Sequence, residues 1–221
     1  MANLWYLSPS NQQKNVGIGS YGTEAEQMYL LCDAITPHLD RCGVEFTVAN
    51  FVTPISSRPS QANQMKADYY LALHSNAGGN GGAWGPVAYY HTAGLPLAEA
   101  LIKELLVTGQ KTNRWSNIYQ KKGLIETRGP VAPAVLLEVD FHDSKTGVDF
   151  LMNRRADAAK AIAKAIVAID GKSWTESPAS AQSEAQDLGI FPAGDINWDV
   201  PITKGDAAKA LVNLFHILKG A

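Results

Sequence analysis

Residues 132–143 read Ala-Pro-Ala-Val-Leu-Leu-Glu-Val-Asp-Phe-His-Asp, and this stretch decides the fold. Its apolar run, 134–137, has the length and composition of a strand that is buried on both faces, as strands of parallel sheets are. Glu138 follows this run directly. A carboxylate at such a place is costly unless it has a partner or a chemical task.

A second apolar run, 69–73, ends in a similar way. It reads Tyr-Tyr-Leu-Ala-Leu and is followed by His74, Ser75 and Asn76. In open α/β sheets, ligands bind at the carboxyl ends of the strands. Each residue alone has an ordinary explanation, a satisfied histidine or a salt-bridged glutamate. Together, His74 and Glu138 favour a catalytic site.

Strand-like and helix-like segments alternate along the chain. Strands are expected at 3–7, 44–48, 69–73, 87–91 and 134–139, and helices at 23–43, 59–67, 97–106, 146–152 and 157–169. Thr23 and Glu26 form a capping box at the first helix, which Pro37 is expected to bend or interrupt. Residues 113–129 are basic and are expected to be irregular. The alternation predicts an α/β fold, with helices on both faces of a mostly parallel, twisted sheet.

The composition excludes several classes of partner. A net charge of −2 over 221 residues gives no electrostatic reason to expect nucleic acid. The chain has no apolar run long enough for a membrane-spanning helix, so we expect no membrane insertion. The first residues lack the basic start and apolar core of a signal peptide. We therefore expect a protein that is made in the cytoplasm.

The chemistry of a metal hydrolase needs three protein ligands, an open position for water and a base beside that water. His74 can be one ligand and Glu138 the base. Glu24 lies in the first turn of the first expected helix. It can be a second ligand, or it can simply compensate the helix dipole.

These residues resemble the zinc-dependent N-acetylmuramoyl-L-alanine amidases of bacterial autolysins and phage endolysins (the amidase_3 family), over about residues 3–170. Leu-His-Ser-Asn-Ala around His74 is similar to the family's second histidine motif, and Glu24 to its glutamate ligand. Ala-Val-Leu-Leu-Glu is similar to the motif that carries its catalytic glutamate, here Glu138. The resemblance implies zinc as cofactor and peptidoglycan as partner. The expected reaction is hydrolysis of the bond between N-acetylmuramic acid and L-alanine by metal-activated water.

The chain departs from this family at the first ligand. The family usually has a histidine just after the first strand, whereas residues 8–13 here read Ser-Pro-Ser-Asn-Gln-Gln. An amide oxygen binds zinc more weakly than imidazole does. Gln12 has the longer reach and is similar to a divergent branch with Ser-Pro-Ser-x-Gln, so it is the predicted third ligand. Asn11, which aligns more directly with the histidine, is the alternative.

Other residues near these motifs are expected to support the site. Asn76, Thr127 and Arg128 are expected to line the substrate groove. Arg128 would face a carboxylate of the stem peptide, or be a plain surface arginine. Asp140 and His142, close in sequence to the catalytic glutamate, are expected to be its hydrogen-bond partners.

The composition changes near the C-terminus, and we expect three parts: a catalytic domain at 1–172, a linker at 173–183 rich in Ser, Ala and Pro, and a small helical module at 184–221. Residues 188–208 resemble a single S-layer-homology motif. Such motifs bind secondary cell-wall polymers, which implies a wall anchor. The alternative is a helical hairpin that packs on the catalytic domain.

Two other functions are compatible with the sequence. Loss of the first histidine also fits a catalytically weak or inactive amidase-like protein that binds the cell wall, and a zinc site also fits a peptidase that acts on stem peptides. Glu138, which has no packing reason to be there, favours the amidase. Without a signal peptide, the enzyme would reach the wall after release, through phage lysis or mother-cell lysis.

Overall fold

A six-stranded sheet lies at the centre of the computed structural model, which describes residues 3–78 and 80–176. The strands, in the spatial order β2-β1-β3-β6-β4-β5, are β1 (Leu4–Pro9), β2 (Glu45–Val48), β3 (Tyr69–Asn76), β4 (Val87–His91), β5 (Ile118–Gln120) and β6 (Ala134–Phe141). The helices are α1 (Glu24–Arg41), α2 (Arg58–Gln64), α3 (Leu95–Val107), α4 (Ile125–Arg128), α5 (Lys145–Asn153) and α6 (Arg155–Ile169), with short 3-10 turns η1 (Ile55–Ser57) and η2 (Thr92–Gly94).

The sheet is mostly parallel, as the alternation of strands and helices predicts. Four neighbouring pairs are parallel, namely β1 with β2, β1 with β3, β3 with β6, and β4 with β5. The exception is β4, which runs antiparallel to β6. The predicted α/β class is therefore confirmed, with one reversed strand pair that the sequence did not indicate.

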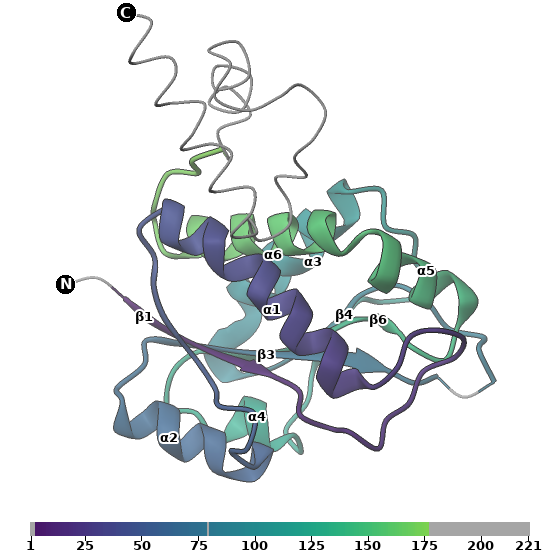
Figure 1. Ribbon diagram of the computed structural model, residues 1–221. Coiled ribbons are helices and arrows are strands. Elements are labelled where there is room, and N and C mark those ends of the chain that lie inside the picture. Colours follow the sequence, from purple (N-terminus) through teal and green to yellow (C-terminus); the bar gives the residue numbers. More distant parts are fainter. Residues whose placement is uncertain (1–2, 79, 177–221) are drawn as a thin grey trace, which may run out of the picture. The chain divides into compact units, whose positions relative to one another are not determined.

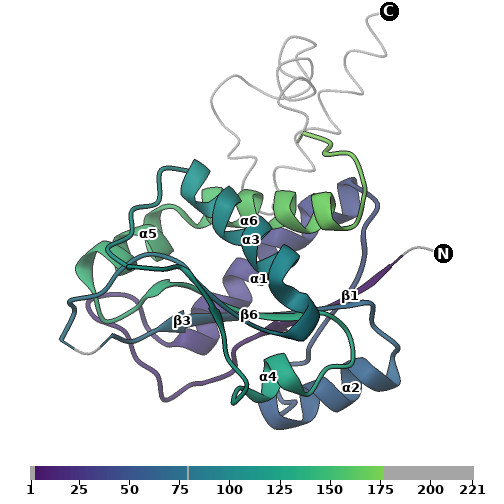
Figure 2. The same ribbon diagram turned by 180° about the vertical axis from the view of Figure 1, so that it is seen from behind.

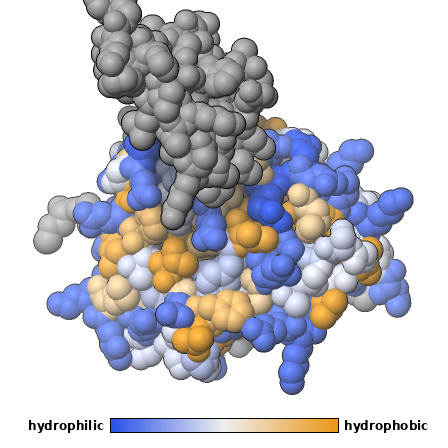
Figure 3. Space-filling view, viewed as in Figure 1, coloured by the Kyte–Doolittle hydropathy of each residue, from blue (hydrophilic) through white to orange (hydrophobic). Residues whose placement is uncertain are grey.

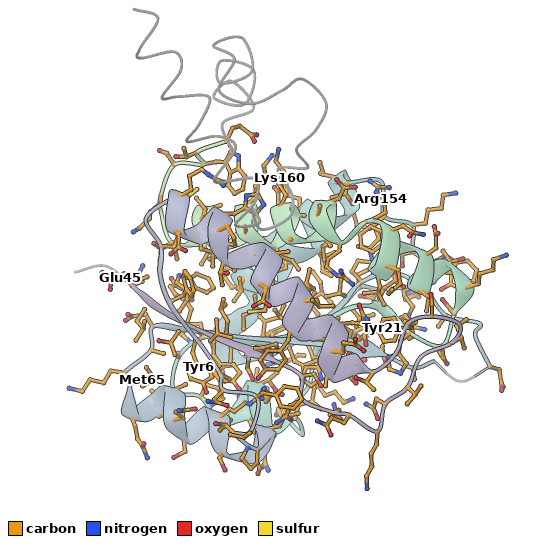
Figure 4. The ribbon with its side chains drawn as sticks, viewed as in Figure 1. Tyr6, Tyr21, Glu45, Met65, Arg154 and Lys160 are labelled. Atoms are coloured by element: carbon orange, nitrogen blue, oxygen red, sulfur yellow. The ribbon has the colours of Figure 1, made fainter. Side chains whose placement is uncertain are left out.

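Helices cover both faces of the sheet (Figures 1 and 2). Helices α1, α3 and α6 lie on one face and α2 and α4 on the other. The larger core lies under the first group and includes Trp5, Leu7 and Leu71. On the opposite face Tyr6 lies above α2, as Figure 4 shows, and its hydroxyl donates to Gln61 Oε1 at 2.6 Å.

Side chains alternate between these two faces along each central strand. In β3, Leu71 and Leu73 enter the larger core, whereas Tyr70 and Ala72 face α2 and α4. The same alternation puts the next residue, His74, on the α2–α4 face. Because β1 and β6 alternate in register with β3, chemical side chains at all three strand ends gather on that face.

Helix α1 begins as its capping box predicts. The Thr23 hydroxyl accepts a hydrogen bond from the Glu26 backbone N–H at 3.2 Å. Pro37 does not interrupt the helix, which continues to Arg41, and the alternative expectation of a bend there stays a prediction. Proline removes a donor to the carbonyl four residues earlier, and Thr36 Oγ1 donates to that carbonyl, of Asp33, at 3.4 Å.

Two other predictions about local structure need correction or extension. Residues 113–129 are not wholly irregular, because they contain β5 and the single turn of α4. Strands β3 and β6 also extend beyond their apolar runs, to Asn76 and Phe141. The sheet thus includes the polar residues that the sequence placed just after the strands.

No helix within the described ranges is long and apolar enough to cross a membrane. On the face seen in Figure 3, hydrophilic and apolar side chains are interspersed.

The described residues continue past α6 to residue 176. In this segment the ring centre of Trp174 lies 5.5 Å from that of His38 on α1. The predicted helical module at 184–221 lies outside the described residues.

Candidate functional site

A pocket of about 470 Å³ opens on the α2–α4 face of the sheet. It is lined by Gln12, Ile55, Ser56, His74, Leu124, Ile125, Glu126, Leu136 and Glu138. His74 on β3 and Glu138 on β6 are direct partners in the parallel pairing. The two strand ends that stand out in the sequence therefore meet at one place.

Helix α1 brings Glu24 to this pair. Its Oε1 lies 2.8 Å from Nδ1 of His74, and its Oε2 accepts a hydrogen bond from Asn15 Nδ2 at 2.6 Å. Burial raises the pKa of Glu24, but the hydrogen bond and the charge of His74 outweigh burial and lower that pKa below its usual value. Glu24 is thus an ionised, oriented carboxylate.

The loop after β1 approaches the same ring nitrogen. Gln12 has its amide nitrogen 3.4 Å from Nδ1 of His74, and rotation of the amide by 180° would present the oxygen there instead. Asn11 points elsewhere, because its amide donates to the backbone carbonyls of Phe51 and Thr53 at 2.8 and 3.0 Å. Of the two amides, only that of Gln12 faces His74.

A residue that sequence reasoning missed, Glu126, completes the surroundings of His74. It lies on α4, is 1% exposed, and has its Oε2 2.8 Å from Nε2 of His74. Its other oxygen accepts hydrogen bonds from Ser8 at 2.5 Å and Tyr70 at 2.7 Å. The signal for it is slight: a lone acidic residue in a basic stretch, which becomes buried only because residues 125–128 form a helical turn.

Glu24 and Glu126 contact opposite nitrogens of the His74 imidazole. Burial alone lowers the pKa of His74, but the hydrogen bonds to Glu126 and Glu24 outweigh it and raise the pKa to about 10. Metal-free His74 is therefore an imidazolium between two anions. Each carboxylate compensates part of the cost of burying that charge.

Glu138 differs from these paired groups. One of its oxygens, Oε2, is shielded from solvent and has no hydrogen-bond partner. Burial raises the pKa of Glu138 to about 7, and the neighbouring charge of His74 opposes this rise. A carboxyl with such a pKa can both accept and return a proton near neutral pH.

The predicted groove residues are not gathered around this pocket. Thr127 is buried, and its hydroxyl donates to the carbonyls of Lys121 and Leu124 at 3.3 and 3.1 Å. Arg128 is exposed at the end of α4. Asn76 is partly buried at the end of β3, where its Oδ1 accepts from the Ala77 backbone N–H. Their predicted part in substrate binding stays a prediction.

The two residues expected to support Glu138 hold other parts of the strand end. Asp140 accepts hydrogen bonds from the backbone N–H of Gly85 and from the Gln110 amide, at 2.8 and 2.7 Å. His142 has its Nδ1 2.9 Å from Ser75 Oγ, and its ring stacks on Tyr21, which is labelled in Figure 4. Within the described residues neither is hydrogen-bonded to Glu138, and both instead hold the segments beside it.

The donor set fits a metal ion only in part. Within residues 3–78 and 80–176, no three His, Cys, Asp or Glu side chains are arranged to hold one. Nδ1 of His74 nevertheless faces Glu24 and Gln12 together, and Glu138 adds an unpartnered oxygen to the same pocket. One imidazole, one carboxylate and one amide suit an ion that keeps an open position for water, with the amide as the weakest donor.

Comparison with known proteins identifies the family and the fold. The family model Amidase_3, described as N-acetylmuramoyl-L-alanine amidase, matches residues 13–168. The fold is similar to that of N-acetylmuramoyl-L-alanine amidase AmiC2 of Nostoc punctiforme, with 20% identity, a TM-score of 0.67, and coverage of 76% of this chain and 96% of that one. The fold is also similar to that of the catalytic domain of CwlV, an N-acetylmuramoyl-L-alanine amidase from Bacillus (Paenibacillus) polymyxa var. colistinus. The identity is 16% and the TM-score 0.67, and the match covers 77% of this chain and 99% of that one. At such identities these structures show a shared fold. Among curated proteins, no sequence match was found.

Proposed function

This chain belongs to the N-acetylmuramoyl-L-alanine amidase family, and from that premise we propose that it hydrolyses the amide bond between N-acetylmuramic acid and L-alanine in peptidoglycan, with zinc as cofactor. The observation that carries this proposal is Glu138. Its unpartnered, shielded oxygen lies in a pocket, on the strand beside His74. A buried carboxyl without a partner is costly for folding, so a chemical task is the natural reason for it.

Three residues would hold the metal ion: Glu24, His74 and Gln12. The bound ion would supply Lewis acidity, lowering the pKa of a water molecule and polarising the carbonyl of the scissile amide. This chain replaces the family's first histidine with an amide. We therefore propose a zinc site that is weaker than one with two imidazoles.

Glu138 would be the general base and then the general acid. Its carboxylate accepts a proton from the attacking water as the water oxygen bonds to the amide carbon. It then returns that proton to the nitrogen of L-alanine as the carbon–nitrogen bond breaks. Burial raises the pKa of Glu138 to about 7 in the metal-free protein. The charge of a bound ion would lower that pKa, so Glu138 would be ionised when it accepts the first proton.

Glu126 would position His74 for metal binding. When the Nε2–H of the ring donates to Glu126, the Nδ1 lone pair is left facing Glu24 and Gln12. Carboxylates often orient metal-binding histidines in this way and select the tautomer. Hydrogen bonds from Ser8 and Tyr70 in turn hold Glu126 in place.

The test is an analysis of reaction products. Purified peptidoglycan, incubated with zinc-loaded protein, should yield peptides that begin with a free L-alanine amino group, while the glycan strands stay intact. Glu138→Gln protein should release these peptides about 10²–10⁴-fold more slowly. Cleavage within the stem peptide would favour the peptidase instead. Binding to the wall without any release would favour the inactive wall-binding protein.

The route to the wall and any wall anchor are further proposals. Release by phage lysis or mother-cell lysis would suit a protein made in the cytoplasm. The single S-layer-homology-like motif would bind a secondary cell-wall polymer, but it falls in 188–208, outside the described residues. Deleting 177–221 and measuring sedimentation with whole walls tests the anchor separately from the chemistry.

A further inference from the structure

A second pocket, of about 330 Å³, lies one strand beyond the catalytic pocket. It is lined by Tyr89, Arg114, Tyr119, Gln120 and Lys121. Two of these residues are aromatic and two are cationic. The pocket is therefore a positively charged recess with aromatic walls, and the proposed chemistry assigns it no role.

The two pockets share one face of the sheet. Tyr89 on β4 is the register partner of Leu136 on β6, and Leu136 lines the catalytic pocket. Tyr89 and Leu124 both pack against the apolar cluster on the α2–α4 face. On the other side, Tyr89 pairs with Tyr119 of β5, and their rings are 5.9 Å apart. A substrate in the catalytic pocket can thus extend across β4 into the second pocket.

Neither cation is held in an ion pair within residues 3–78 and 80–176, although the charge of Lys121 acts on Glu138 and opposes the rise of its pKa. Instead, the Lys121 ammonium lies 4.7 Å from the ring centre of Tyr89, and the Arg114 guanidinium 5.7 Å from that of Phe141. Contacts with ring faces orient a cation without using its hydrogen-bond donors. Both cations therefore keep donors available for an anion.

We propose that this pocket binds a carboxylate on the peptide side of the scissile bond. The inference rests on the proposed amidase function, and it names the part of the substrate that the enzyme selects. A neutral sugar ring is the weaker candidate, because the Lys121 ammonium already lies over one face of Tyr89. In a wall fragment the lactyl carboxyl of N-acetylmuramic acid is consumed in the amide, so free carboxylates lie on the peptide.

The experiment uses two soluble muropeptides that differ in one group. One carries a free carboxylate on the residue after L-alanine, and the other carries the corresponding neutral amide. We expect wild-type protein to favour the free acid in kcat/KM by about tenfold, because each exposed ion pair contributes about two- to fivefold. In 1 M salt, where the screening length is about 3 Å, the preference should shrink.

Charge-removing variants locate the preference. Arg114→Gln and Lys121→Gln should each lower the ratio of the two kcat/KM values by about two- to fivefold. Lys103→Gln is the matched control, since it removes one positive charge from an exposed position on α3, on the opposite face of the sheet. The control should keep the wild-type ratio.

A binding measurement separates the two hypotheses. Glu138→Gln protein, loaded with zinc, is titrated with each muropeptide by calorimetry. Tighter binding of the free acid, weakened when Lys121→Gln is combined with Glu138→Gln, supports the carboxylate pocket. This holds even if wild-type protein cleaves neither muropeptide. In that case only the amidase proposal fails. Equal cleavage and equal binding of both compounds, unchanged by Arg114→Gln and Lys121→Gln, would overturn the pocket and leave the amidase proposal intact.

Discussion

Glu126 and His74 are 52 positions apart in the chain, yet Oε2 of the first lies 2.8 Å from Nε2 of the second. Glu24 contacts the opposite nitrogen of the same ring. The imidazole therefore cannot rotate without breaking at least one of these contacts. A ring held in this way offers a fixed donor direction, and the first prediction follows from that rigidity.

Glu126→Ala should weaken zinc binding by about 10- to 100-fold, because the ring loses the partner that selects its tautomer. Glu126→Gln should have a smaller effect, since an amide oxygen can still accept from Nε2–H. Affinity is measured by competition with a chelating dye, and the visible spectrum of the cobalt-substituted protein reports the ligand geometry. Unaltered affinity and spectrum in Glu126→Ala would remove Glu126 from the proposed site.

Glu138→Gln should lower kcat by about 10²–10⁴-fold, the usual contribution of a general acid–base group. Zinc content should stay unchanged, because Glu138 is not among the proposed ligands. His74→Ala, by contrast, should lose the metal as well as the activity. Elemental analysis beside the product assay distinguishes the two results, and an active Glu138→Gln protein would mean that the base lies elsewhere.

The two amides of the loop after β1 should respond differently to alanine. Gln12→Ala should reduce zinc affinity, and Gln12→His should increase it, because imidazole is the stronger donor. Asn11→Ala should instead cost about 1–2 kcal/mol of stability, through the hydrogen bonds that it gives to two backbone carbonyls. Chemical denaturation and zinc titration of both variants test this. An increase in affinity for Asn11→His and none for Gln12→His would reverse the assignment.

Glu138 should also make the stability of the metal-free protein depend on pH. Burial raises its pKa from 4.5 to about 7, so folding favours the protonated form. That contribution is fully present below about pH 4.5 and is lost as pH rises through about 7. Relative to Glu138→Gln in the presence of a chelator, wild-type protein should lose about 1–3 kcal/mol of unfolding free energy over this range. If the unfolding free energies of the two proteins changed with pH in parallel, the raised pKa of Glu138 would be contradicted.

Local patterns were sufficient to predict most of the fold. The run before Glu138 and the run before His74 are buried central strands, because long apolar segments between polar ones have few other places in an α/β protein. The Thr23 cap is equally local. Helix α1 passes through Pro37, however, because a nearby threonine compensates the missing donor, and this depends on geometry rather than spacing.

The candidate site could be predicted only where a residue directly follows an apolar strand. His74 and Glu138 satisfy that rule. Glu126 does not, because its burial depends on how α4 packs against β6 and on distant hydroxyls of Ser8 and Tyr70. Asp140 and His142 show the opposite error. Their closeness in sequence to Glu138 suggested hydrogen bonds to it, but the β3–β6 register shifts after the His74–Glu138 pair, and both side chains bond to other residues.

The reversed direction of β4 also affects how this protein can change. Because β4 starts beside Glu138, the segment between Asn76 and Val87 leaves and re-enters the sheet at the same edge. In an all-parallel sheet, that segment would have to travel the whole length of a strand. Here the segment between Asn76 and Val87 can become longer or shorter without changing how β3, β6 and β4 pair. Insertions between Asn76 and Val87 would thus add new surface beside the strand ends that carry His74 and Glu138 while the catalytic strands keep their register, which makes this the natural place to engineer or evolve a new specificity.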